Sequence, residues 1–152
     1  VSLRACLEGA QRILRTRIEQ AGAQLLVELP PEDLYVAADT VQLEQVLVNL
    51  IGNACDVLAG RDERIIRVGA TSSGDQVRLQ VRDSGPGIAV RHLDRIFDPF
   101  FTTTESGLGL GLSISHTIVQ RLGGTLSVAN APEGGAVFTL TLIAWSDASA
   151  AD

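Results

Sequence analysis

The sequence contains no lysine and no methionine, only two cysteines, and few aromatic residues. All twelve basic residues are therefore arginines, which excludes chemistry that needs a lysine amine, such as a Schiff base or a P-loop lysine. Cys6 and Cys55 are too few for a disulfide scaffold. Both fall in helical patterns, so we expect buried free thiols. No group of cysteines and histidines has the spacing of a metal site.

The acidic balance of the chain excludes a further class of partner. Eighteen acidic residues against twelve basic ones give a formal net charge of −6, whereas general binding to nucleic acid needs a basic surface. No uncharged stretch is long enough to form a transmembrane helix, and no signal peptide begins the chain. We therefore expect a soluble, cytoplasmic protein that does not bind nucleic acid.

The length of 152 residues predicts a single domain. We expect this domain over residues 1–145 and a disordered tail over residues 146–152, which are mostly small or polar. The chain begins inside a helical pattern and has no methionine, so we expect it to be a piece of a longer protein.

Hydrophobic periodicity predicts three long helices, one short helix and six strands. The helices are expected over residues 2–21, 40–59 and 110–122, with the short one near 90–96. The strands are expected over residues 24–29, 34–37, 65–71, 77–83, 125–129 and 136–143. This order predicts an α+β two-layer sandwich with three main helices on one face of a mixed, mostly antiparallel sheet.

The helix expected over residues 40–59 carries an unusual polar face. On a helical wheel its polar side chains fall within about 80° of one another: Gln42, Gln45, Asn49, Asn53 and Asp56. Asparagine is a poor helix former, so we interpret this face as lining a site, with a solvated surface as the alternative. An asparagine oxygen is a suitable ligand for Mg²⁺, which otherwise takes phosphate and water oxygens.

Two glycine-containing segments follow this helix. Asp83 continues the apolar phase of its strand, so its carboxylate faces the core and needs hydrogen-bond donors, such as the exocyclic amine of a purine. Gly85 and Gly87 let the backbone approach a flat ring, and a plain turn is the alternative. Residues 107–112 alternate glycine and leucine where a helix begins, which favours an anion site.

A fourth segment, residues 97–104, holds three of the four phenylalanines beside a polar stretch. This composition suits a lid with an apolar anchor. A loop pinned to the core by its aromatic side chains is an equal alternative.

Together, these four segments resemble the ATP-binding catalytic domain of bacterial sensor histidine kinases, within the superfamily of gyrase, Hsp90, histidine kinase and MutL ATPases (GHKL). Residues 44–56 resemble the N box, 83–87 the first glycine box, 96–103 the F box and 107–112 the second glycine box. Residues 134–142 resemble the closing hairpin. The amino-acid sequences of the F box, the second glycine box and the closing hairpin are most similar to those of the nitrogen-regulation and C4-dicarboxylate sensor kinase branch.

This resemblance implies a Bergerat-type fold that binds Mg-ATP. Asn49 and Asn53 would be the catalytic residues: Asn53 would coordinate Mg²⁺ and Asn49 would face the same site. Asp83 would bind the adenine amino group. Residues 98–109 would form the ATP lid. The nucleotide-binding residues implied are Asn49, Asn53, Asp56, Asp83, Gly85, Gly87, Ile88, Phe97, Thr103, Gly107, Leu108, Gly109, Leu110, Gly111 and Leu112.

The resemblance also implies partners. The domain would supply the γ-phosphoryl group of ATP to a histidine on a dimerisation and phosphotransfer domain, and act through it on a response regulator in two-component signalling. Neither His92 nor His116 has the acidic neighbour of such an acceptor, so we expect both to be ordinary surface or packed residues. The isolated domain is expected to be a monomer, and its parent a homodimer that can be anchored in the bacterial inner membrane.

Two positions bear on the reaction. Asn49 stands where the ATP-hydrolysing branches carry a glutamate, and an amide cannot act as a general base, which favours a kinase. Thr104 stands where the sensor branch usually carries a lysine. A lost charge-assisted hydrogen bond of about 1.5–3 kcal/mol would weaken ATP binding roughly 10- to 100-fold, and Arg91 and Arg95 are candidates to compensate.

Two alternatives remain. One is an ATP-hydrolysing or serine-directed kinase member of the same superfamily. The other is a degenerate nucleotide-sensing module that docks onto a regulator.

Overall fold

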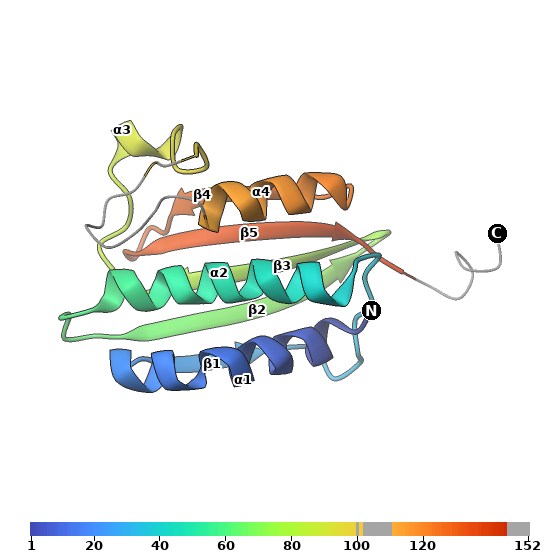
Figure 1. Ribbon diagram of the computed structural model, residues 1–152, viewed down its shortest axis with the longest axis horizontal. Coiled ribbons are helices and arrows are strands. Elements are labelled where there is room, and N and C mark those ends of the chain that lie inside the picture. Colours follow the sequence, from blue (N-terminus) through green and yellow to red (C-terminus); the bar gives the residue numbers. More distant parts are fainter. Residues whose placement is uncertain (100, 102–110, 146–152) are drawn as a thin grey trace.

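The structure is a computed structural model that describes residues 1–99, 101 and 111–145. Among these residues one five-stranded sheet carries three main helices on one of its faces (Figure 1). The helices are α1 (Leu3–Ala21), α2 (Thr40–Leu58) and α4 (Gly111–Arg121), and a short α3 (Val90–Leu93) lies apart from them at one end. The predicted two-layer sandwich is therefore confirmed.

The strands follow the order β1-β2-β3-β5-β4 across the sheet. They are β1 (Gln24–Glu28), β2 (Ile65–Ser73), β3 (Gln76–Asp83), β4 (Thr125–Asn130) and β5 (Ala136–Ile143). β1 runs parallel to β2 and the other neighbours are antiparallel, which makes the sheet mixed as predicted. β2 and β3 each extend further than predicted, to Ser73 and Gln76. The physical reason is that a two-residue turn with Gly74 at φ +61° joins them, so residues 72 and 73 stay in the ladder.

Local caps fix the ends of the two long helices. The Ser2 hydroxyl accepts a hydrogen bond from the Ala5 N–H at 3.2 Å, and Gly22 ends α1 at φ +66°. The Asp39 carboxylate accepts from the Val41 N–H at 3.1 Å where α2 begins. Both starts agree with the sequence pattern, because serine and aspartate satisfy backbone N–H groups that the first turn leaves open.

Residues 34–37 do not form the predicted strand. They make two isolated bridges, Ser2 with Tyr35 and Val36 with Ala144. The Val36 N–H donates to the Val1 carbonyl, and the Ala37 N–H to the Ile143 carbonyl, each at 2.9 Å. The segment thus lies between the first residues of the chain and the end of β5, where neither neighbour continues long enough to build a ladder.

One predicted helix is shorter than expected, and another begins at the edge of the described residues. The short helix expected near residues 90–96 ends at Leu93, because the bonds from the Arg95 N–H to the His92 carbonyl and from the Asp98 N–H to the Arg95 carbonyl are three-residue turns. α4 is described from Gly111, so the predicted start at residue 110 lies outside the described residues.

The core lies between the helices and the sheet. The side chains of Leu47, Leu50 and Ile51 on α2 are fully buried, as are Ile66 on β2 and Leu140 on β5. α2 lies between α1 and α4 and contacts both helices and the strands β2 and β3 (Figure 1). This packing places the C-terminal half of α2 beside the end of β3, where the polar side chains singled out above meet.

Candidate functional site

A cavity of about 260 Å³ lies between α2, the end of β3, α3 and β5. Most of its wall is apolar, with Val57, Ile96 and Phe138 among the lining side chains. Three polar side chains also line it: Asn53, Asp83 and His92. An apolar cavity with a few converging polar groups is typical of a small-molecule site.

Asp83 is placed as the sequence predicted, at the end of β3 and on the core side. It is 4% exposed. Its Oδ1 accepts hydrogen bonds from the Gly85 N–H at 2.8 Å and from the Ala136 N–H at 3.4 Å. Burial raises the pKa of this carboxyl above its ordinary value, and the two backbone hydrogen bonds oppose that shift. A carboxylate has further acceptor capacity that these two donors do not use.

The loop after Asp83 is held by a side chain that the sequence analysis missed. The Oδ1 of Asn130, the last residue of β4, accepts from the Ile88 N–H at 2.7 Å. Its Nδ2 donates to the Ile88 carbonyl, also at 2.7 Å. Gly87 adopts φ +80°, and a Cβ there would lie 2.8 Å from the same Oδ1. We call this the Asn130–Ile88 pair; it explains why a glycine is needed at 87.

The polar face of α2 does not line a single site. Asn53 lines the cavity. Asn49 instead donates from Nδ2 to the Gly111 carbonyl at 3.2 Å and to the Ser115 hydroxyl at 3.1 Å, and so joins α2 to α4. Ser115 is fully buried, and nothing in its sequence context had marked it.

Asp56, on the same face of α2, points to another neighbour. Both of its carboxylate oxygens accept from Nη2 of Arg17 on α1, at 2.8 and 2.7 Å. Because α2 lies between two helices, side chains close together on its wheel divide between α1, the cavity and α4. A nucleotide-binding role for Asp56 stays a prediction.

Phe97 anchors the segment that follows α3. Its ring stacks on His116 of α4 with centroids 5.0 Å apart and meets the Phe138 ring edge-on at 6.2 Å. His116 is therefore a packed residue, as expected. His92 packs as well, edge-on against the Phe101 ring, and it also lines the cavity, a position that no local pattern in the sequence had indicated.

Several predicted residues lie outside the described part of the chain. They are Thr103, Gly107, Leu108, Gly109 and Leu110, together with most of the predicted lid. Of the second glycine box, Gly111 begins α4 beside Asn49, where a Cβ would lie 3.7 Å from the Asn49 Cγ, and Leu112 is partly buried.

A second, larger hollow of about 620 Å³ also has residues 83–86 in its lining. Its lining mixes charges of both signs, including Arg67, Arg82 and Glu133, and Arg82 forms an ion pair with Glu133 at 2.6 Å. Asn53 does not line it. The smaller cavity therefore remains the candidate site.

Metal and membrane features are limited in the residues that the structure describes. They contain no group of three or more His, Cys, Asp or Glu side chains that could hold a metal ion. Mg²⁺ often uses only one or two protein ligands, and Asn53, which is part of the cavity lining, carries one amide oxygen. In the same part of the chain, no helix is long and apolar enough to cross a membrane. Cys6 and Cys55 are free and buried, and burial raises the pKa of each thiol.

Comparison with known families gives one domain match. The family described as histidine kinase-, DNA gyrase B-, and HSP90-like ATPase matches residues 38–144. The chain is 38% identical over 133 residues to the C4-dicarboxylate transport sensor protein DctB of Rhizobium meliloti (strain 1021), which covers 88% of this chain and 21% of that protein. It is 46% identical over 107 residues to the sensor histidine kinase ZraS of Escherichia coli (strain K12), covering 70% of this chain and 23% of that one.

Solved structures agree with these relatives. The nucleotide-free catalytic domain of histidine kinase ThkA superposes with a TM-score of 0.84 at 32% identity, covering 94% of this chain and 93% of that one. Full-length ShkA in complex with AMPPNP gives a TM-score of 0.81 at 29% identity, covering 96% of this chain and 31% of that one. The chain thus spans a fifth to a quarter of the curated relatives named above.

Proposed function

Because the chain belongs to the histidine kinase-, DNA gyrase B- and HSP90-like ATPase family, as the ATP-binding domain of a sensor histidine kinase, we propose that it binds ATP with Mg²⁺ and supplies the γ-phosphoryl group to a histidine on a separate dimerisation domain. One observation carries this proposal. Asn53 and Asp83, which the sequence assigned to the two ends of a nucleotide, line the same cavity.

The Asp83 end of the cavity suits a purine base. The buried carboxylate is held by the Gly85 and Ala136 N–H groups and still has acceptor capacity for an exocyclic amine. Ile96 and Phe138 offer apolar surface to the ring. An adenine fits this chemistry, because its exocyclic amine is a donor.

The Asn53 end suits the metal and the phosphates. The amide oxygen of Asn53 would hold Mg²⁺, which supplies charge neutralisation for the phosphates when bound. Gly111 begins α4 next to Asn49, and the first N–H groups of a helix favour an anion. These residues bind and orient the nucleotide in the proposal.

Asn49 favours phosphoryl transfer over hydrolysis. Its side-chain amide donates to Gly111 and Ser115 on α4, and an amide does not take a proton from water. We therefore expect slow turnover of ATP by the isolated domain.

The wider assembly follows from this role. The acceptor histidine would lie on a dimerisation and phosphotransfer domain of the parent protein, and a response regulator would receive the phosphoryl group from it. The parent would be a homodimer, whereas the isolated domain would be a monomer.

Calorimetric titration with ADP and with ATP, each with and without Mg²⁺, tests the binding step. We expect saturable binding of one nucleotide per chain, stronger for ATP when Mg²⁺ is present. No binding at millimolar nucleotide would contradict the proposal and favour the docking module. If nucleotide binds, radiolabelled ATP and a separately supplied acceptor domain test phosphotransfer, and robust release of phosphate by the domain alone would favour the hydrolase alternative.

A further inference from the structure

His92 is one of three polar side chains that line the 260 Å³ cavity. The other two, Asn53 and Asp83, already have a role in the proposed nucleotide site. The remaining lining side chains are apolar or absent, including Val57, Ile96 and Phe138. Polar groups in such a cavity fix the orientation of a ligand, so the third polar group needs an assignment.

The imidazole of His92 is held in place from its own side of the cavity. Its helix, α3, spans Val90–Leu93, and the backbone N–H of His92 donates to the Ala89 carbonyl at 2.8 Å. The ring meets the Phe101 ring edge-on, with centroids 5.2 Å apart. The guanidinium of Arg95 lies over the same Phe101 ring at 5.2 Å. These contacts fix the ring by packing.

In the part of the chain that the structure describes, neither ring nitrogen of His92 has a hydrogen-bond partner. The side chain is partly buried. A neutral imidazole carries one donor and one acceptor on a flat ring. This combination matches the ring nitrogens of a purine and the hydroxyl groups of a ribose, which lie next to each other in a nucleoside.

We propose that His92 binds the nucleoside part of the nucleotide through a ring nitrogen and is a third polar contact beside Asp83 and Asn53. The inference rests on the proposed function, because it assigns a residue to the same site. It concerns the base and ribose, since His92 shares the cavity wall with Asp83, Gly87 and Ile88, the residues at the base end. The chain has no lysine that could contact the nucleotide. A His92 contact would add a polar group that lies outside the motifs identified in the sequence.

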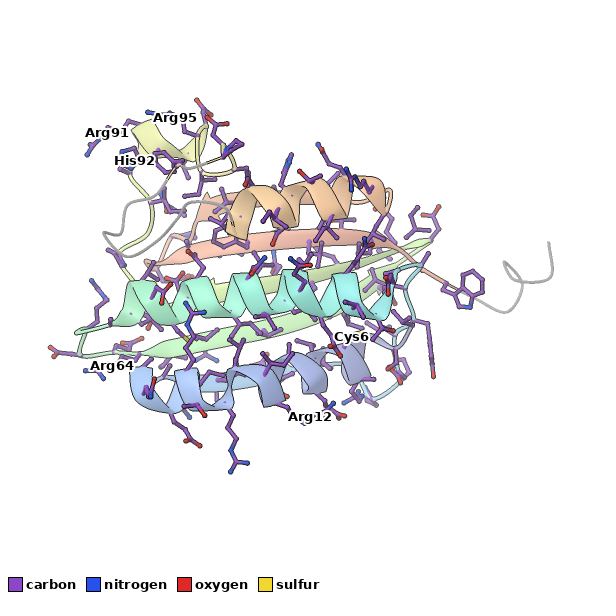
Figure 2. All side chains as sticks on the ribbon, viewed as in Figure 1. Cys6, Arg12, Arg64, Arg91, His92 and Arg95 are labelled. Atoms are coloured by element: carbon purple, nitrogen blue, oxygen red, sulfur yellow. The ribbon has the colours of Figure 1, made fainter. Side chains whose placement is uncertain are left out.

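The test compares three variants by calorimetric titration with ADP and with AMP. His92→Ala removes the ring, and His92→Phe keeps a ring for packing against Phe101 but removes the nitrogens. Val90→Ala is the matched control on the same helix, because Val90 is 79% exposed and is not part of the cavity wall. Figure 2 shows where His92 lies on this helix. We expect about tenfold weaker binding of both nucleotides in the two His92 variants, the size of one hydrogen bond. Val90→Ala should bind as the wild type does.

A nuclear Overhauser effect between the His92 ring proton Hε1 and the H8 or H1′ proton of bound ADP provides a readout that a packing role would not give. Full affinity in His92→Phe, or wild-type affinity in His92→Ala, would overturn the assignment. In both cases the wild type still binds ADP, so the proposed function stands. If the wild type itself does not bind ADP, the proposed function is contradicted, and the His92 contact is contradicted with it.

Discussion

The two ends of the cavity are built in different ways. Around Asp83 the polar groups are fixed by the sheet, since the carboxylate accepts from the backbone N–H groups of Gly85 and Ala136 and the Asn130–Ile88 pair adds two bonds of 2.7 Å. Near Asn53, the neighbouring Asn49 connects two helices through longer bonds of 3.1 and 3.2 Å. A base can thus meet a preformed surface, whereas the other end depends on how α4 sits against α2.

Asp83→Asn is expected to break the Asp83 end most strongly. The amide cannot offer the adenine amine a charged acceptor, and a hydrogen bond to a charged group contributes about 1.5–3 kcal/mol. We expect ADP affinity to fall roughly 10- to 100-fold and the preference for ATP over GTP to be lost. Titration with both nucleotides measures this, and unchanged selectivity would count against the base contact.

Asn53→Ala probes the opposite end. If Asn53 holds the metal, binding of Mg-ATP should weaken about tenfold, the effect of losing one protein ligand. Metal-free ADP should bind nearly as it does to the wild type. Titrations with and without Mg²⁺ separate the two effects, and equal losses for both ligands would rule out the metal role.

Asn130→Ala tests whether nucleotide binding at the Asp83 end depends on the Asn130–Ile88 pair. Two hydrogen bonds, each worth about 0.5–1.5 kcal/mol, would be lost from the loop. We expect the free energy of unfolding to fall by about 1–3 kcal/mol and ADP to bind several-fold more weakly. Urea unfolding and titration measure these, with Ser127→Ala, an exposed position on the same strand, as the matched control. Wild-type ADP affinity in Asn130→Ala would show that the pair serves stability alone.

Ser115→Ala tests the hydrogen bond between Asn49 on α2 and Ser115 on α4. The buried hydroxyl accepts from Asn49, so its removal should lower the free energy of unfolding by about 1 kcal/mol. Thr117→Ala, which removes an exposed hydroxyl on the same helix, serves as the control. A loss of ADP affinity larger than that of Asn130→Ala would reverse the comparison between the two ends.

The smallest expected effect concerns pH. The pKa of Asp83 is raised above its ordinary value of 3.8, so the ionised carboxylate costs stability at neutral pH. That cost is absent below pH 3.8, where the group is protonated in both states, and it appears as the pH rises through the raised pKa of the folded state. The wild type should therefore gain stability relative to Asp83→Asn as the pH falls from 7 to 4. Urea unfolding of both proteins at several pH values checks this, and a constant difference would contradict it.

The sequence predicted the features that depend on local order. Periodicity of 3.6 and 2.0 placed the helices and strands, and it placed Asp83 on the core side because a strand alternates its side chains. It also brought attention to Asn53, whose residue type is unusual on a helix face. These signals lie within one element, so they need no knowledge of its neighbours.

The sequence could not predict which side chains on different helices and strands bond to one another. The helical wheel showed that Asn49, Asn53 and Asp56 share a face, but it could not show that Arg17 reaches one of them and Ser115 another. The Asn130–Ile88 pair joins residues 42 positions apart, and no local pattern distinguishes Asn130 from other polar strand ends. His92 was set aside because its position in the cavity wall depends on how α3 packs.

β5 connects two parts of the molecule that have been described separately. The N–H of its first residue, Ala136, donates to Asp83, and the carbonyl of its last residue, Ile143, accepts from Ala37, beside the bridges to the first residues of the chain. The strand is held along its length by ladders to β3 and β4 on either side. With a ladder on each side, these eight residues resist bending and move as one rigid segment. A displacement of the chain's first residues relative to the cavity must therefore either break the bridges at residues 35 and 36 or carry β5 and both of its ladders along.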